Sequence, residues 1–252
     1  MIDSPVTIIT GSSRGIGRTT AELLASRGHA VVVSSRSQDS CESVAEGIRE
    51  AGGQALALAC HIGREEELAA LVEKTAERFG RIDSIIMNAA SNPVYGPSSN
   101  VDRKAFDVIM HNNVFGAMRL AHLARPYLEK SDGPAIALVS SIAGQFGNKL
   151  IGVYGMSKAA EDQLVRNLAL ELGPVGIRVN AVAPGLVKTD FAQALLDDER
   201  MVRYFESTTP LRRLAEPDDI AGVLAFLVSP DSAWLSGQVI TADGGLSVTG
   251  GF

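Results

Sequence analysis

The sequence has 252 residues, of which 46% are hydrophobic and 21% charged, and its formal net charge at neutral pH is −6. This length and balance are ordinary for one globular α/β domain, which can bury a core without disulfides or metals. The negative net charge and the absence of a Lys/Arg run argue against nucleic acid or an anionic membrane as a partner, because both require a positive surface.

Targeting and redox signals are also missing from the sequence. Met1–Thr10 has neither the basic start nor the apolar stretch of a signal peptide, and no apolar run approaches the roughly 18 residues of a membrane span. Cys41 and Cys60 form no metal-binding motif and indicate free thiols in a reducing compartment. We therefore expect a cytoplasmic protein with no metal site.

Short apolar, β-branched runs alternate along the chain with longer helical patterns. Strands are expected at Val6–Thr10, Ala30–Ser35, Ala55–Cys60, Ser84–Asn88, Ala135–Ser140, Arg178–Ala183 and Gln238–Ala242. Helices are expected at Gly15–Ser26, Ser40–Ala51, Glu65–Phe79, Asp102–Leu128, Tyr154–Glu171 and Asp218–Leu227. This alternation predicts right-handed crossovers and a parallel sheet that is covered by helices on both faces. No linker divides residues 1–252, so we expect a single domain.

One segment interrupts the alternation. Residues 190–210 lie between the sixth strand and the last helix and are too long for a minimal connection. Apolar side chains such as Phe191 and Leu195 stand among charged residues in this segment. Long insertions in compact domains are usually lids or binding loops, so we expect a substrate lid here.

The first expected strand runs into a glycine-rich turn, Thr10–Gly17, which opens the first helix. Such a turn brings backbone N–H groups and the positive end of a helix close to a diphosphate. We expect Gly11 to allow the tight turn, Gly15 the close approach and Gly17 the contact between helix and sheet. The turn residues assigned to the cofactor are Gly11, Ser13, Arg14, Gly15, Ile16 and Gly17.

The end of the second strand bears on the choice of cofactor. An acidic residue at this position binds the ribose 2′-hydroxyl of NAD(H) and repels a 2′-phosphate. This chain has Ser35 followed by Arg36, whose guanidinium is a good partner for a phosphate, and Arg14 lies in the nearby turn. The pattern favours NADP(H) over NAD(H).

Tyr154 and Lys158 are four residues apart and share one face of the expected helix. A free tyrosine has a pKa of about 10, and a neighbouring ammonium lowers it by favouring the phenolate. Ser141 follows the fifth strand, and parallel sheets bind ligands at the carboxyl ends of their strands. We therefore expect Ser141, Asn88, Gly185 and the glycine-rich turn to lie along one edge of the sheet.

These motifs together resemble the short-chain dehydrogenase/reductase family over essentially the whole chain. The resemblance is based on five motifs: Thr10–Gly17, Asn88-Ala89-Ala90, Asn113-Val114-Phe115-Gly116, Tyr154/Lys158 and Pro184-Gly185 followed by Thr189. It implies a Rossmann fold with a seven-stranded parallel sheet of order 3-2-1-4-5-6-7 and helices on both faces. The stretches at residues 60–63, 88–93 and 183–189 are similar to the NADP-dependent carbonyl reductases of this family.

The resemblance also implies roles for individual residues. Tyr154 would donate a proton to a carbonyl oxygen that Ser141 binds, and Lys158 would lower the pKa of Tyr154 and hold the nicotinamide ribose. Asn113 would hold a water molecule that connects Lys158 to solvent; Asn112 is the competing choice, and the spacing to Gly116 favours Asn113. Further cofactor contacts are implied for His61, Ile62, Asn88, Ala89, Ala90, Pro184, Gly185, Val187 and Thr189.

Two departures from the family pattern and several alternatives remain. Ala90 replaces the usual glycine after Asn88-Ala89, and His61-Ile62 replaces the usual Asp-Val near adenine. The family implies a small carbonyl or alcohol substrate and a homotetramer. The alternatives are a 3-oxoacyl-carrier-protein reductase, with Arg212 and Arg213 as a docking patch, and a non-catalytic nucleotide-binding scaffold on the same fold.

Overall fold

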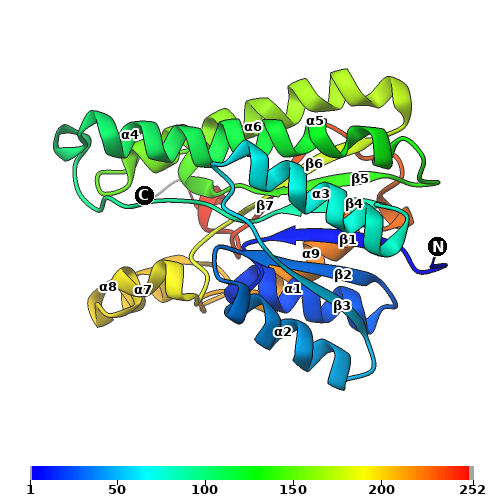
Figure 1. Cartoon of the computed structure of the whole chain (residues 1–252). Coiled ribbons are helices and arrows are strands. Elements are labelled where there is room, and N and C mark those ends of the chain that lie inside the picture. Colours follow the sequence, from blue (N-terminus) through cyan, green and yellow to red (C-terminus); the bar gives the residue numbers. More distant parts are fainter. Residues whose placement is uncertain (1, 250–252) are drawn as a thin grey trace.

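A computed structural model describes residues 2–249, which form a sheet between two layers of helices (Figure 1). The sheet has seven parallel strands in the order β3-β2-β1-β4-β5-β6-β7, as expected. The strands are β1 (Val6–Thr10), β2 (Ala30–Ser35), β3 (Gln54–Ala59), β4 (Ser84–Met87), β5 (Ala135–Val139), β6 (Arg178–Pro184) and β7 (Val239–Ala242). The predicted fold class is confirmed.

Each face of the sheet packs against its own layer of helices. One layer contains α3 (Glu65–Phe79), α4 (Arg103–Met110), α5 (Gly116–Leu128) and α6 (Gly152–Leu172). The other contains α1 (Gly15–Ser26), α2 (Gln38–Glu50) and α9 (Pro217–Val228). Alternate residues of β1 enter the two cores, with Ile8 in the first and Ile9 in the second. This double burial explains why the central strands read as continuous apolar runs.

The largest difference from the expected elements lies in the long helix expected at Asp102–Leu128. It is interrupted by the π-helix η2 (His111–Phe115), which separates α4 from α5. Gly116 lies directly beyond this interruption, and a Cβ on it would lie 2.3 Å from the carbonyl oxygen of Ile62. The helix thus presses against the loop after β3, and an extra residue in one turn is a common response at functional sites.

Smaller differences at element ends follow from local hydrogen bonds. Helix α2 begins two residues earlier than expected, at Gln38, because the Ser37 side chain accepts a hydrogen bond from the Ser40 amide at 3.3 Å. Strand β4 ends at Met87, because the Asn88 amide donates to the Thr10 hydroxyl at 3.1 Å instead of continuing the ladder.

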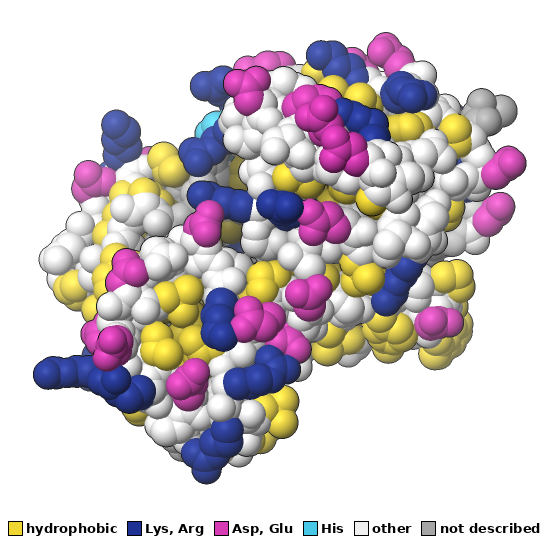
Figure 2. Space-filling view, turned by 90° about the horizontal axis from the view of Figure 1, so that it is seen from below, with side chains coloured by type: hydrophobic (Ala, Val, Ile, Leu, Met, Phe, Trp, Pro, Cys, Tyr) yellow, Lys and Arg dark blue, Asp and Glu magenta, His cyan; other side chains and the backbone are white. Residues whose placement is uncertain are grey.

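The segment expected to form a lid contains short helices of its own, η5 (Asp190–Ala192), α7 (Gln193–Leu196) and α8 (Glu199–Thr208). In Figure 1 α7 and α8 project to one side, away from the layers that cover the sheet. On the face that carries α1 and α2, basic and acidic side chains are interspersed (Figure 2). Among residues 2–249, no helix combines the length and apolar character needed to cross a bilayer.

Asp83 joins three strands at the amino edge of the sheet. Its carboxylate accepts hydrogen bonds from the Val6 amide at 2.7 Å, from the Ser131 hydroxyl at 2.5 Å and from Nε and Nη2 of Arg81. Burial alone would raise the pKa of Asp83, but these hydrogen bonds outweigh burial and hold that pKa below its usual value. A carboxyl with a lowered pKa stabilises the fold above its unfolded pKa of about 3.9, and this stabilisation is lost as pH falls through the folded value.

Replacement of this carboxylate therefore has a pH-dependent cost. We predict that Asp83→Asn lowers the free energy of unfolding by about 1–3 kcal/mol at neutral pH, because an amide cannot accept all of these hydrogen bonds. The deficit should shrink as the pH falls below about 4, because the wild-type advantage is lost between the unfolded pKa and the lower folded pKa of Asp83. Urea unfolding at fixed protein concentration measures the free energy of unfolding at neutral and at acidic pH. Asp132→Asn, a change at an exposed position, is the control. An equal deficit at both pH values would contradict the assignment.

Candidate active site

The glycine-rich turn between β1 and α1 has the shape that a diphosphate requires. Gly11 and Gly15 have φ angles of +66° and +52°, a region that side chains strongly disfavour. A Cβ on Gly15 would lie 3.1 Å from the Thr189 methyl group, so the turn and the loop after β6 face each other closely. The N-cap residue Arg14 makes no side-chain hydrogen bond to the first N–H groups of α1, so its side chain does not compete with phosphate oxygens for them. The turn therefore fits a dinucleotide.

Asn88 holds this turn against the sheet. Its side-chain amide donates to the carbonyl oxygens of Thr10 at 3.1 Å and Gly11 at 2.9 Å. The Thr10 hydroxyl in return accepts from the backbone amides of Asn88 and Ala89. A Cβ on Gly17 would lie 2.6 Å from the Asn88 side-chain nitrogen, so Gly17 packs against this clamp as well as against the turn. Asn88 thus braces the nucleotide turn from the neighbouring strand.

The residues expected at the adenosine end lie at the carboxyl ends of β2 and β3. Ser35 ends β2, and its hydroxyl contacts the Cys41 sulfur at 3.1 Å. Arg36 is exposed and has no ion-pair or hydrogen-bond partner among residues 2–249. Arg14 forms an exposed ion pair with Asp190 at 3.3 Å. Of the two arginines, only Arg36 therefore has a guanidinium free of protein partners.

His61 and Ile62, in the loop after β3, are held by backbone interactions. The His61 amide donates to Glu67 at 2.7 Å, and the His61 ring accepts from the Gly63 amide at 3.1 Å. Ile62 lines a small cavity together with Ala89, Asn113 and Glu161. The loop thus reaches from the expected adenine end to the interior of the site.

Tyr154 and Ser141 come from different elements and meet at the carboxyl edge of the sheet. Tyr154 is 8% exposed on the first turn of α6, and Ser141 lies two residues after the end of β5. The Ser141 oxygen accepts a hydrogen bond from the Ala143 amide at 3.1 Å, which leaves its own proton free to donate. The Ser141 side chain also lowers the pKa of Tyr154, so the two hydroxyl groups lie near each other. Two hydroxyl donors are therefore available to one substrate oxygen.

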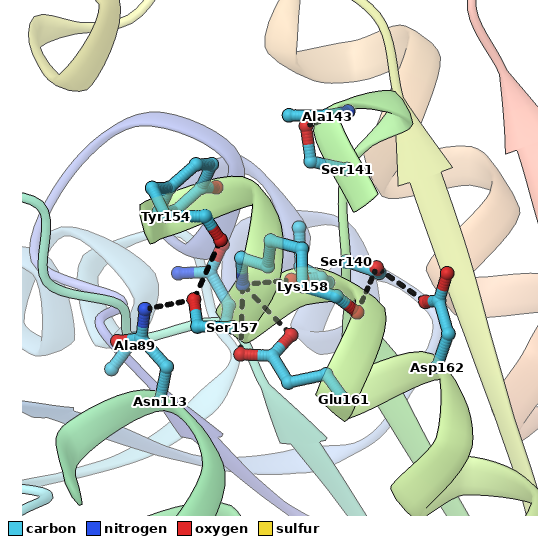
Figure 3. A network of polar contacts seen from close by, with 12 residues as sticks. Ala89, Asn113, Ser140, Ser141, Ala143, Tyr154, Ser157, Lys158, Glu161 and Asp162 are labelled. Carbon is cyan, nitrogen blue, oxygen red and sulfur yellow. Dashed lines mark hydrogen bonds and ion pairs between the residues drawn. The ribbon is translucent and has the colours of Figure 1, made fainter. Parts of the chain in front are cut away.

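Lys158 lies beneath Tyr154 and has a partner that the sequence analysis did not identify. Its ammonium is 5.4 Å from the centre of the Tyr154 ring and donates to Glu161 Oε1 at 3.0 Å, to Glu161 Oε2 at 2.8 Å and to the Val139 carbonyl at 2.8 Å. Figure 3 shows Tyr154, Lys158 and Glu161 on successive turns of α6. The sequence signal that could have identified Glu161 is its spacing of three residues from Lys158, since positions three apart on a helix face each other.

These contacts change the expected electrostatics of Tyr154. Burial raises the pKa of Tyr154; the charge of Lys158 lowers it, Glu161 raises it, and the Ser141 side chain lowers it, with a net increase. Burial would lower the pKa of Lys158, but Glu161 and Tyr154 raise it above its usual value. Lys158 therefore lowers the pKa of Tyr154, as expected, but burial and Glu161 together raise that pKa by more.

Asn113 lies in the π-helix η2 and is 1% exposed. Its side-chain nitrogen donates to the Ser157 hydroxyl at 3.0 Å and to the Ser91 carbonyl at 3.1 Å, and its oxygen accepts from the Ser91 amide at 2.7 Å. Asn112 instead donates to the Ser91 hydroxyl at 2.9 Å. Asn113 is thus tied to the helix that carries Tyr154, whereas Asn112 donates to the loop after β4.

The remaining expected residues lie in the loop that follows β6. Pro184 ends β6, and the Gly185 amide donates to the Ala242 carbonyl of β7 at 3.1 Å. A Cβ on Gly185 would lie 3.1 Å from Asp243, so only glycine fits without a shift. Val187 forms a bridge with Ala215, which directs the chain toward Thr189. This loop closes the side of the site opposite the glycine-rich turn.

Metal and thiol chemistry have no visible basis in this region. Within residues 2–249, no group of three or more His, Cys, Asp or Glu side chains could hold a metal ion. Cys41 and Cys60 are both free and buried. Burial raises the pKa of Cys60 to about 12, so its thiol is not a nucleophile near neutral pH.

Several known proteins are similar in sequence to this chain. A family model described as Enoyl-(Acyl carrier protein) reductase matches residues 11–247. Dehydrogenase/reductase SDR family member 4 from Sus scrofa is 35% identical, with 97% of this chain and 88% of that protein covered. The 7alpha-hydroxysteroid dehydrogenase of Escherichia coli (strain K12) is 38% identical, with coverage of 97% and 94%.

Solved structures agree with the sequence matches. A 7 alpha-hydroxysteroid dehydrogenase complexed with NADH and 7-oxo glycochenodeoxycholic acid has a TM-score of 0.92 at 37% identity, covering 96% of this chain and 94% of that one. A short-chain type dehydrogenase/reductase from Mycobacterium ulcerans also has a TM-score of 0.92, at 30% identity with coverage of 97% and 90%. With the motifs at one edge of the matching sheet, the chain belongs to the short-chain dehydrogenase/reductase family of oxidoreductases.

Proposed function

We propose that this protein transfers a hydride between NADP(H) and a carbonyl/secondary alcohol pair. The observation that carries the proposal is the meeting of Ser141 and Tyr154 above Lys158, at the sheet edge that also bears the glycine-rich turn. The names of the relatives support the same reaction class, since they are dehydrogenases and reductases. Asn113, which anchors the π-helix to Ser157, completes the proposed set of site residues.

When bound, a nicotinamide cofactor would supply the hydride chemistry that interconverts the carbonyl and the alcohol. Tyr154 donates its phenolic proton to the carbonyl oxygen as negative charge develops there, and Ser141 donates a hydrogen bond to the same oxygen. In the reverse direction the Tyr154 phenolate removes the proton of the alcohol. Lys158 stabilises the phenolate through its charge. The expected turn contacts (Gly11–Gly17) and the loop from Pro184 to Thr189 hold the cofactor.

Loss of the phenolic proton should remove the chemistry without removing the cofactor site. We predict that Tyr154→Phe lowers turnover about a hundredfold or more, the usual scale for the loss of a general acid. NADPH affinity, measured by fluorescence titration, should barely change. Tyr127→Phe on α5 is the matched control, because this ring lies beside Lys130 at the far end of its helix. Near-normal turnover by Tyr154→Phe would refute the mechanism.

The proposed preference for NADP(H) depends on the end of β2. Ser35 introduces no carboxylate there, and the unpaired guanidinium of Arg36 is available to a 2′-phosphate. Arg14 is already paired with Asp190, so Arg36 is the stronger candidate. One charge-assisted hydrogen bond contributes roughly 1.5–3 kcal/mol, or about ten- to a hundredfold in affinity. A related structure contains NADH, so the preference requires a direct test.

Steady-state kinetics with both cofactors provide this test. We expect a higher kcat/KM with NADPH than with NADH for the wild type. Arg36→Ala should weaken NADPH binding about tenfold or more and leave NADH nearly unaffected, and Ser35→Asp should reverse the preference through repulsion of the phosphate. Exposed Arg27→Ala, at the opposite end of α1, is the charge-matched control. A wild type that prefers NADH would overturn the cofactor proposal and leave the reaction class intact.

An apolar substrate fits the walls beside Tyr154. Tyr95, Leu150 and Phe191 are large apolar side chains that remain between 37% and 52% exposed. The Gly96 amide donates to the Leu150 carbonyl at 2.7 Å, which brings the loop after β4 next to the loop before α6. Phe191 lies 5.6 Å from Tyr154, measured between ring centres. We propose a ketone with a hydrophobic body and would include a 7-oxo bile acid among the substrates tested.

A 3-oxoacyl-carrier-protein reductase is the second candidate, because the matching family model is described as a reductase of acyl-carrier-protein substrates. A carrier protein would dock on a basic patch. Arg213 is already held by Asp219 through two hydrogen bonds, and Arg212 donates to the Ser207 carbonyl. This engagement disfavours the patch, and comparison of acyl thioesters with free ketones separates the candidates. A non-catalytic scaffold, by contrast, would bind NADPH but would turn over neither acyl thioesters nor free ketones.

Residues 190–210 fit the role of a substrate lid. Neither α7 nor α8 contains a buried residue, so little packing holds them to the rest of the molecule. The segment reaches the site through Phe191 and reaches the nucleotide turn through the ion pair of Asp190 with Arg14. The homotetramer and the cytoplasmic location that the sequence favours remain predictions; one relative is named as mitochondrial.

The lid should be the least protected part of the described chain without ligands. We predict that amide hydrogen exchange in residues 190–210 slows when NADPH and a substrate analogue bind, because closure orders the segment. The amides of β5, which is fully buried, are the internal reference and should be protected in both states. Strong and equal protection of the segment with and without ligands would rule out a mobile lid.

A further inference from the structure

The acid that holds Lys158 is not used in the reaction as described above. The side chains of Lys158 and Glu161 are 2% and 4% exposed, so the pair is sealed inside the protein. Removing two charges from water is costly unless both are paired with good geometry. An uncharged residue at position 161 would leave the Lys158 ammonium buried without an ionic partner, so Glu161 both compensates this charge and determines where the ammonium lies.

Glu161 engages most of the hydrogen-bonding capacity of Lys158. An ammonium has three N–H donors, and the Lys158 nitrogen lies within hydrogen-bond distance of Glu161 Oε1, Glu161 Oε2 and the Val139 carbonyl. The position of the ammonium under the Tyr154 ring is therefore fixed largely by Glu161. Tyr154, Lys158 and Glu161 form one column along α6 (Figure 3).

The charged and titratable groups around Glu161 are few. Lys158, Asp162 and Tyr154 belong to its own helix. The described residues that line the cavity beside Glu161 come from β1, β4, β5, η2, α5 and the loops after β3 and β4. Besides Glu161 they are uncharged, and the polar ones are Thr10, Asn112 and Asn113. His111 is the titratable residue of η2, and its ring binds the Gly63 carbonyl instead. Glu161 therefore acts chiefly on Lys158 and Tyr154.

We propose that Glu161 is a positioning residue of this site: its buried carboxylate fixes the Lys158 ammonium and sets the pH at which Tyr154 exchanges its proton. This inference depends on the proposed function, since it concerns the same acid/base. The negative charge of Glu161 opposes the effect of Lys158 and raises the pKa of Tyr154. Burial raises the pKa of Glu161 itself to about 7, so the carboxylate is charged in the alkaline range where Tyr154 ionises.

The test is the pH dependence of alcohol oxidation, in which Tyr154 must be deprotonated. Glu161→Gln keeps the shape and one acceptor oxygen but removes the charge. The rise of kcat/KM with pH should move to lower pH, by on the order of one pH unit, because an opposite charge then acts on Tyr154 without compensation. Glu161→Asp, which restores the charge, should return the profile toward that of the wild type. An unchanged profile in Glu161→Gln would overturn the proposal.

Asp162→Asn is the matched control. Asp162 is the next acid on the same helix, but it accepts a hydrogen bond from the Ser140 hydroxyl at 2.5 Å, and Lys158 acts on it through charge. Its removal should leave the profile close to that of the wild type. Equal shifts in Glu161→Gln and Asp162→Asn would mean that any buried acid on α6 has the same effect, which would refute a specific role for Glu161.

A second measurement separates this inference from the proposed function. The ultraviolet absorbance of tyrosinate reports the ionisation of Tyr154 directly when the titration of Tyr154→Phe is subtracted, and it requires no turnover. Tyrosinate should form at lower pH in Glu161→Gln than in the wild type, whether or not a substrate is known. If the wild type shows no turnover but the titration shifts, the proposed function fails and the role of Glu161 stands. If turnover is normal and neither readout shifts, the role of Glu161 fails alone.

Discussion

The site depends on the clamp that joins the carboxyl ends of β1 and β4. The strand order reverses at β1, which pairs with β2 on one side and β4 on the other, and such switch points leave a crevice at the strand ends. Asn88 crosses this point and binds the carbonyls of Thr10 and Gly11. Because those carbonyls are held from the side, the N–H groups of the turn and of α1 point into the crevice. The phosphate cradle is therefore a property of the sheet as much as of the glycines.

The two edges of the same sheet have different tasks. At the amino edge Asp83 connects β1, β4 and β5 through hydrogen bonds that serve stability. At the carboxyl edge the hydroxyl groups of Ser141 and Tyr154 can still donate hydrogen bonds. They therefore contribute to the chemistry, whereas Asp83 contributes to stability. Helix α6 links the site to the core, because its apolar side, including Val165 and Leu168, packs on the sheet. A rigid helix holds Tyr154 at a fixed place relative to the turn.

Much of this arrangement could be predicted from the sequence, because its signals are local. The strand runs, the glycine-rich turn and the spacing of Tyr154 to Lys158 each follow from short-range geometry. The π-helix could not be predicted from local patterns, because it borders a close contact of Gly116 with the Ile62 carbonyl, and these residues are far apart in the chain. The pairing of Arg14 with Asp190 is likewise a long-range contact that the turn motif does not contain.

Glu161 shows most clearly why local patterns are insufficient for electrostatics. A glutamate three residues after a lysine on a helix usually forms an exposed pair that contributes little. Only the burial of this turn of α6 makes the same pair a strong influence on a neighbouring phenol. A lysine alone would favour the phenolate, and a sealed carboxylate beside it partly cancels that effect while holding the ammonium in place. The strength of the acid/base is thus decided by how the charges are buried together and not by the motif residues alone.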